Sequence, residues 1–262
     1  MSGAFAVIRR GISDQRLAVL TWGGSLGLMG AFIAAIYPSV RDSLAKVVQS
    51  YPSGLKEAFG VTGFDTVESY VHAEMFSLIV PLAVGFFAIR SATRETVTAE
   101  ENGYLETILS LPLARRVLAA GSALATLVIC AGILAVTGVL IFVAGRIAGT
   151  GISLGLTFAG AFGLWPLAVF FAGVAAVAGG LVGRSAEVTG IATGILVGMY
   201  VLDLAGRLST SIEPVRWFSA FRYYGAPLRD GIDISHFVGL TAAGIALIGV
   251  GAVLFDRRDL RH

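Results

Sequence analysis

The sequence predicts an all-α polytopic membrane protein with six transmembrane helices. Of its 262 residues, 56 % are apolar and only 14 % are charged, and the mean hydropathy is +0.82. Soluble domains carry about a quarter charged residues, so this composition indicates a chain that lies mostly in lipid. Several uncharged runs are also long enough to cross about 30 Å of hydrocarbon. We therefore expect a single transmembrane domain that covers residues 1–262.

Four spans follow directly from long uncharged runs, and two more follow from shorter ones. The runs at 75–89 and 188–202 each hold 15 uncharged residues, so they reach spanning length only with charged ends such as Glu74 or Asp203. Residues 1–16 are weakly amphipathic and are expected to lie along the inner membrane surface. In chain order, the expected spans are about 17–37, 71–93, 117–144, 154–182, 188–206 and 236–255.

Basic residues are distributed unequally between the two sides of the expected bundle. The segments on the side of the termini hold 11 Lys or Arg in 57 residues, whereas the loops on the opposite side hold 8 in 74. Cytoplasmic loops carry the excess of basic residues in membrane proteins, so this bias places both termini in the cytoplasm. An even number of spans agrees with this assignment, because it returns the chain to the side on which it started.

Small residues recur at a spacing of four within three of the spans, and this spacing lets helices approach closely in lipid. We expect most of these rows to pack inside the bundle, and one of them could face a second subunit. The rows are Gly23, Gly27, Ala31 and Ala35 in the first span, Ala172, Ala176 and Gly180 in the fourth, and Gly190, Gly194 and Gly198 in the fifth.

A charged segment, EENGYLETILSLPLARR, separates spans 2 and 3 at Glu100–Arg116. Helical periodicity places an apolar group on one side of this segment, with Glu101 beside that group, where the carboxylate needs a partner or water. We therefore predict a short amphipathic cytoplasmic helix at 100–111, ended by Pro112, that can carry force from a partner protein; an interfacial loop with a solvated charged face is the alternative. Its expected contact residues are Glu100, Glu101, Gly103, Tyr104, Leu105, Glu106, Ile108 and Leu109.

The loop before the last span, residues 207–235, is dense in aromatic side chains with arginines between them. Such a composition suits a segment that lies at the outer membrane interface or dips partly into it as a re-entrant loop, although an ordinary aromatic belt would have the same composition. The aromatic residues concerned are Trp217, Phe218, Phe221, Tyr223 and Tyr224.

Spans 2 and 5 hold the same place in the two three-span halves, and both are short and interrupted by charge. Corresponding irregular spans indicate a translocation path, although the same apolar side chains could also face lipid or pack within the bundle. Asp203 has Arg207 one helical turn away, so a local ion pair is favoured over a substrate or proton role. The expected lining residues are Phe76, Val80 and Phe86 from span 2 and Leu196, Met199 and Tyr200 from span 5.

Several kinds of chemistry are not expected in this chain. The two lysines, Lys46 and Lys56, do not follow the glycine pattern of a phosphate-binding loop, and the three histidines lack zinc-binding spacing. The stretch GGSLG at 23–27 matches the GxSxG nucleophile motif, but it lacks the strand-to-helix turn that the motif requires. Neither a metal nor a cofactor nor a nucleic-acid partner is expected, and transport remains ahead of a membrane scaffold or an intramembrane hydrolase.

Three stretches in the same order resemble the permease subunits of type-2 ABC exporters. Glu101, Gly103 and Glu106 match the E-x-G-x-x-E core of the family's cytoplasmic signature, and ILSLP with a basic pair follows at 108–116. VRWFSAFRYYGAPLRDG is similar to the family's aromatic segment before the last span, and LFDRRDL at 254–260 is similar to its C-terminus. Ala220 replaces the proline that usually follows the loop serine, so the local loop geometry is expected to differ.

This resemblance implies that the chain is the permease of an exporter in the bacterial cytoplasmic membrane, and that it is not an enzyme by itself. ATP and Mg²⁺ would bind to a separate ABC ATPase subunit, present in two copies, that contacts the segment at 100–111. The resemblance also implies a dimer with a second copy or a homologous permease around a central path, in contact with membrane lipids. Relatives export drugs, peptides, lipids, polysaccharides and ions, and a hydrophobic drug, an antibiotic or a lipid is slightly favoured here.

Overall fold

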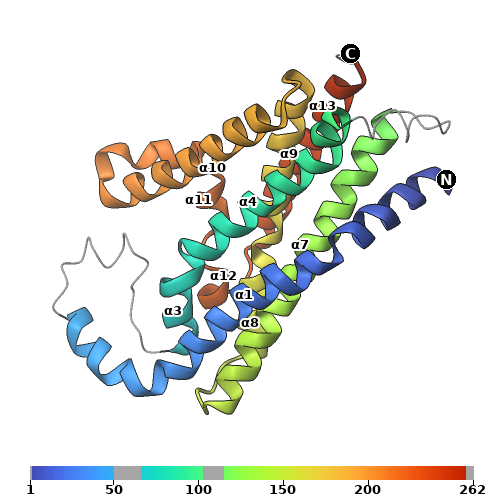
Figure 1. The fold of residues 1–262 in the computed structure, drawn as a ribbon. Coiled ribbons are helices and arrows are strands. Elements are labelled where there is room, and N and C mark those ends of the chain that lie inside the picture. The colour runs from blue at the N-terminus through green and yellow to red at the C-terminus, as the bar shows by residue number, and fades with distance from the viewer. Residues whose placement is uncertain (1, 50–65, 103–114, 258–262) are drawn as a thin grey trace.

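The computed structural model describes residues 2–49, 66–102 and 115–257, and helices form nearly all of this part of the chain (Figure 1). No strand occurs among these residues, in agreement with the all-α prediction. The elements are α1 (Ser2–Gln49), α3 (Val67–Val71), the π-helix η1 (His72–Phe76), α4 (Ile79–Thr93), the π-helix η2 (Arg94–Thr98), α5 (Ala99–Glu101), α7 (Arg115–Ile147), α8 (Leu154–Gly163), α9 (Trp165–Leu181), α10 (Ser185–Leu208), the 3-10 helix η3 (Thr210–Phe218), α11 (Ala220–Tyr224), α12 (Pro227–Asp230) and α13 (Ile234–Arg257).

Among the described residues, five helical stretches are long and apolar enough to cross a membrane, and a bent pair supplies a sixth if it counts as one span. The five lie in α1, α7, α8 with α9, α10 and α13, and the bent pair joins Val67–Phe76 to Ile79–Glu101. The prediction of a helical polytopic membrane protein is therefore confirmed. The start of α1 and the end of α13 lie toward the same end of the bundle as the end of α4 and the start of α7, as an even number of spans requires (Figure 1).

Two of the spans are broken, and a proline lies just after each break. Span 2 bends by 47° at Ser77 and Leu78, because Pro81 has no N–H for the Ser77 carbonyl and its ring crowds that carbonyl. Pro166, the second residue of α9, similarly follows the break at Leu164. The predicted span at 154–182 therefore consists of two helices, α8 and α9. Span 5, which has no proline, is one continuous helix, α10.

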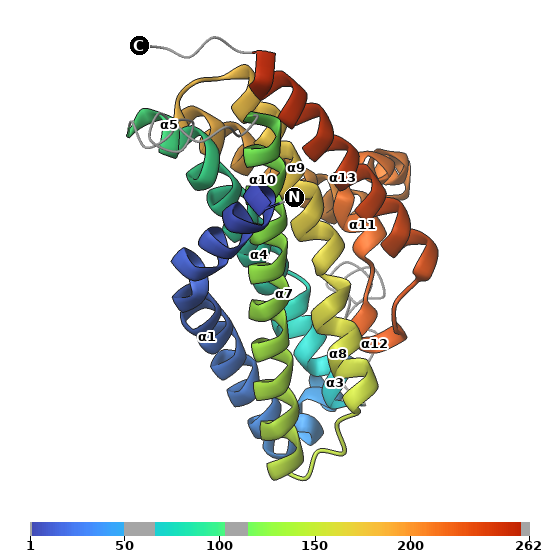
Figure 2. The ribbon, with the colours of Figure 1, turned by 90° about the vertical axis from the view of Figure 1, so that its right-hand side faces the viewer.

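Helix α1 runs without a break from Ser2 to Gln49, so residue 16 is not a helix boundary. Its 48 residues correspond to a length of about 72 Å at 1.5 Å per residue. The helix lies beside α7 (Figure 2). Gly11 and Gln15 are buried, and a Cβ added at Gly11 would lie 2.8 Å from the Ala125 Cβ of α7. The predicted amphipathic segment at 1–16 therefore packs part of its surface against the bundle.

Close contacts at glycine hold α13 against α9, which lies beside it (Figure 2). A Cβ added at Gly244 would lie 2.7 Å from the Phe170 backbone nitrogen, and one added at Gly251 would lie 2.5 Å from the Ala176 carbonyl carbon. In lipid, the hydrophobic effect does not drive helices together, so their association depends on van der Waals packing. Direct contact between two helix backbones maximises this packing. These contacts place α9 in the centre of the bundle, where most of its side chains are buried.

The three predicted rows of small residues have different surroundings. Gly23 and Gly27 of the first row pack against α7, and Gly180 of the second packs against α13. The third row faces outward: a Cβ added at Gly190, Gly194 or Gly198 would meet no atom of the described chain within 4 Å.

Candidate functional site

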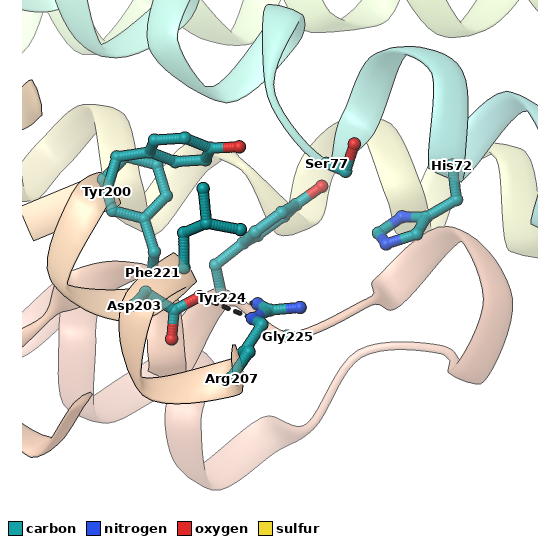
Figure 3. A pocket seen from close by; sticks show the side chains of 9 residues that line it. His72, Ser77, Tyr200, Asp203, Arg207, Phe221, Tyr224 and Gly225 are labelled. Atoms are coloured by element: carbon teal, nitrogen blue, oxygen red, sulfur yellow. Dashed lines mark hydrogen bonds and ion pairs between the residues drawn. The ribbon is translucent and has the colours of Figure 1, made fainter. Parts of the chain in front are cut away.

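A polar cavity of about 40 Å³ lies where the break in span 2 meets α10 and the loop before the last span (Figure 3). At the break, two polar groups of Ser77 bond back to the preceding turn: its N–H donates to the His72 carbonyl at 2.8 Å, and its hydroxyl donates to the Ala73 carbonyl at 2.6 Å. The cavity is large enough for a few water-sized groups. Its lining residues are His72, Ser77, Tyr200, Asp203, Leu204, Arg207, Phe221, Tyr224 and Gly225.

Asp203 forms the charged centre of this cavity and is only 3 % exposed. Arg207 donates to its Oδ2 from Nε at 2.8 Å and lies 2.7 Å from the same oxygen through Nη2. Arg216 of η3 donates from Nε to Oδ1 at 2.9 Å. The predicted Asp203–Arg207 pair is therefore confirmed. The second partner, Arg216, was not predicted, because it lies after the turn that follows α10, where helical spacing no longer indicates which residues are neighbours.

Two polar groups of the cavity have no hydrogen-bond partner within the described residues. These are Nδ1 of His72, a residue that is 3 % exposed, and the buried hydroxyl of Tyr224. Figure 3 shows the Tyr224 hydroxyl directed toward Ser77 and the His72 ring directed toward the same space, with the Arg207 guanidinium on the opposite side of the Tyr224 ring. No sequence pattern predicts this arrangement, because the two residues lie on elements that only the fold brings together.

A second, aromatic cavity of about 390 Å³ lies between α9, α13 and the outer loop. Trp217, Phe218 and Tyr223 line it, and the guanidinium of Arg222 lies 4.3 Å from the centre of the Trp217 ring. The predicted aromatic group is thus divided, since Phe221 is buried and Tyr224 faces the polar cavity. Phe221 packs with its ring centroid 5.4 Å from that of Tyr200.

The six predicted path residues are distributed over the core and the polar cavity. Phe76, Val80 and Leu196 are buried, and Phe86 and Met199 are partly buried. Spans 2 and 5 do meet here, because a Cβ added at Gly85 of α4 would lie 2.7 Å from Leu196 Cδ1. Tyr200 is the one member of the six that lines the polar cavity. Their role in translocation stays a prediction.

At the opposite end of span 2, Glu101 of α5 binds the first residue of α10. Its carboxylate accepts a hydrogen bond from the Ser185 backbone N–H at 2.9 Å and a short one from the Ser185 hydroxyl. At the start of α10, the carboxylate accepts from a backbone N–H that has no partner within the helix. Its negative charge is also stabilised by the positive end of the helix dipole. Ser185 is therefore the partner that the sequence requires for Glu101. A serine directly after a break in the apolar pattern is a typical start of a helix, and this signal could have identified it.

The other predicted contact residues of this segment fall into two groups. Glu100 lies in α5 and is partly buried. The remainder lie outside the described residues: Gly103, Tyr104, Leu105, Glu106, Ile108 and Leu109.

Near that end, a buried polar network joins α1 to α4, η2 and α7. The Ser91 hydroxyl donates to Gln15 Oε1 at 2.6 Å and lies 2.8 Å from the Thr126 hydroxyl, and Gln15 Nε2 donates to Glu95 Oε1 at 2.9 Å. Buried polar side chains in a membrane bundle need such partners, and the bonds fix the relative positions of the helices. This network was not predicted, because residues 1–16, and Gln15 with them, were expected to lie along the membrane surface.

Comparison with known families shows the family of the chain. A family model described as the C-terminal domain of the multidrug efflux system permease Rv1217c matches residues 4–256, a range that includes both cavities and every candidate span except the last residue of α13, Arg257. No curated protein matches the chain significantly. The match and the helices of spanning length together support a multi-pass membrane protein that acts as a transport permease rather than as a catalytic enzyme. The chain belongs to the family of this multidrug efflux permease domain.

Proposed function

We propose that the chain is the membrane-spanning subunit of an ABC exporter in the bacterial cytoplasmic membrane, driven by a separate ATPase that binds ATP and Mg²⁺. The efflux permease family supports a transport role. The ordered signature stretches support the ABC type, and neither Lys46 nor Lys56 lies in a phosphate-binding loop that could make the chain its own ATPase. Two ATPase copies would serve a pair of permeases.

The bond between Glu101 and Ser185 is the observation that best supports coupling through this segment. It ties the start of the predicted coupling helix at 100–111 to the first turn of α10. A partner can shift the permease between states only through contacts that differ between those states. A movement of the coupling segment would act directly on α10 and, through Arg207 and Asp203 at the far end of that helix, on the polar cavity.

The outward row on α10 supports a second permease as the partner within the membrane. Gly190, Gly194 and Gly198 leave a surface on which another helix can approach closely, beside the exposed side chains of Ile191 and Ile195. The partner is a second copy of this chain or a homologous permease, and membrane lipids cover the remaining apolar faces.

The aromatic cavity supports a hydrophobic substrate, such as a drug, an antibiotic or a lipid. Its volume of about 390 Å³ lies in the range of small-molecule sites, which are commonly lined by apolar and aromatic side chains. Trp217 and Phe218 are largely exposed at its edge, where an amphiphile could enter from the membrane interface.

Co-purification tests the proposed subunit composition. The chain is extracted from its native host with a mild detergent, and an ABC ATPase is expected to remain bound to it. The complex should hydrolyse ATP faster when a hydrophobic substrate is added. Recovery of the chain without any ATPase would favour the alternative of a membrane scaffold that does not transport.

Variants of the coupling segment test how the two subunits communicate. Leu105→Ala combined with Leu109→Ala should abolish most substrate-stimulated ATPase activity, since truncating a buried leucine removes about 2 to 5 kcal/mol where packing is tight. Glu106→Ala should weaken coupling only slightly, because an exposed ion pair contributes about 0.2 to 1 kcal/mol. Normal stimulation in the double leucine variant would mean that coupling does not use this segment.

A further inference from the structure

The polar cavity has more hydrogen-bond donors than the protein uses. Arg207 binds Asp203 through Nε and Nη2, and no described residue accepts a hydrogen bond from its Nη1 group. The Tyr224 hydroxyl and His72 Nδ1 are likewise without partners in this part of the chain. A buried polar group without a partner costs about 1 to 3 kcal/mol, so two such groups, those of Tyr224 and His72, beside the partly exposed Arg207 guanidinium indicate a site for a polar ligand.

The charge of the cavity indicates the sign of that ligand. Of the residues that the structure describes, Asp203 is the only acid that lines it, and this carboxylate is shared by two guanidinium groups, those of Arg207 and Arg216. One positive charge therefore remains in excess. The next pair outward, Arg229 with Asp230, is balanced and leaves this excess unchanged. Removing charge from water is costly, so an additional anion here would be favoured over a neutral group.

We propose that this cavity binds an anionic oxygen group, the phosphate or carboxylate of a ligand at the membrane surface. Arg207 would hold one oxygen through Nη1, and Tyr224 and His72 would donate to the same group from the other side of the cavity. A guanidinium suits oxyanions because its N–H groups lie in a plane that matches their geometry. A volume of about 40 Å³ admits a single headgroup or small ion but not a bulky substrate. This site is separate from the aromatic cavity, and it does not require the chain to be an exporter.

Thermal unfolding of the full chain in a neutral maltoside detergent tests the proposal. One sample receives inorganic phosphate, a second receives phosphatidylglycerol, and a third receives diacylglycerol as the uncharged control for acyl chains. A ligand that binds only the folded state raises Tm, and the rise grows with the logarithm of one plus the ratio of the free ligand concentration to Kd. Stabilisation by inorganic phosphate would assign a free anion, whereas stabilisation by phosphatidylglycerol alone would assign a lipid headgroup. No rise with either ligand, or an equal rise with diacylglycerol, would overturn the proposal.

A conservative variant locates the binding. Tyr224→Phe removes a hydroxyl that has no partner within the described chain, so Tm without ligand should stay unchanged or rise slightly. The apparent Kd for the stabilising ligand should increase about 10-fold, as expected for one lost hydrogen bond to a charged group.

Tyr223→Phe is the matched control, because the Tyr223 hydroxyl lies outside this cavity and donates to the Trp217 carbonyl at 3.1 Å. It should leave the apparent Kd unchanged. Equal affinities for wild type and Tyr224→Phe, or an equal loss in both variants, would contradict an anion site at this cavity.

Discussion

Asp203 holds two arginines from different elements, and its charge should therefore contribute strongly to stability. Asp203→Asn would leave Arg207 and Arg216 facing each other without a carboxylate. Removing one partner of a buried ion pair lowers the free energy of unfolding by about 3 to 5 kcal/mol, because the other charge stays buried without compensation. Both arginines are partly exposed, so we expect a loss near the lower value. We expect a clear fall in Tm when the variant is unfolded in detergent.

Asp230→Asn is the control for this prediction. Asp230 also pairs with an arginine, Arg229, but its side chain is 58 % exposed, so its loss should cost less than about 1 kcal/mol. If both variants lose the same stability, the burial of Asp203 does not determine the strength of its ion pairs.

At the scale of the helices, glycine contacts should decide how α13 packs. Gly244→Ala would place a methyl group 2.7 Å from backbone atoms of α9, and such overpacking costs about 1 to 3 kcal/mol. Gly249→Ala, on the same helix, meets no described atom within 4 Å and should stabilise α13 by up to about 1 kcal/mol. Thermal unfolding of both variants measures the difference. A loss in both would indicate that alanine itself is unfavourable in α13.

The contact between α5 and α10 should control the first turn of α10. Glu101→Ala removes both hydrogen bonds to Ser185 and should cost about 1 kcal/mol, the usual value of a side-chain cap at a helix start. Amide hydrogen exchange in that turn should become about 5-fold faster. Glu187→Ala removes an exposed pair with Arg184 and a negative charge from the same turn but no bond to a backbone N–H, so it should speed exchange less than Glu101→Ala. Equal exchange in the two variants would exclude a capping role for Glu101.

Sequence patterns were sufficient for elements whose signal is local. Hydropathy located the apolar spans, and spacing of one helical turn predicted the Asp203–Arg207 pair. Contacts between distant residues had no such signal: Arg216, Ser185 and Gln15 reach their partners through the packing of the helices. Charge at the ends of span 5 indicated an irregular helix, but prolines, rather than terminal charges, accompany the breaks in this fold.

For the molecule as a whole, the outward face of α10 predicts where a second permease binds. Gly194→Cys, in a chain whose buried Cys130 is replaced by alanine, should form a disulfide-linked dimer on oxidation in native membranes. Such a bond requires two Cα atoms within about 7 Å, which glycine-lined helices allow. Gly239→Cys on α13, which also meets no described atom within 4 Å but faces the aromatic cavity, should remain monomeric. Cross-linking through position 239 but not 194 would move the interface to α13.

The ion pair within α10 also has a consequence for biosynthesis. A lone aspartate raises the cost of inserting a helix by as much as about 2.5 to 3.5 kcal/mol at its centre, and less toward its ends. Arg207 lies one turn after Asp203 on the same helix, so the charge can be neutralised as soon as α10 forms at the translocon. Arg216 is synthesised nine residues later than Arg207 and joins the pair from the next element. The nascent α10 can therefore enter the bilayer before the loop that completes the polar cavity has folded.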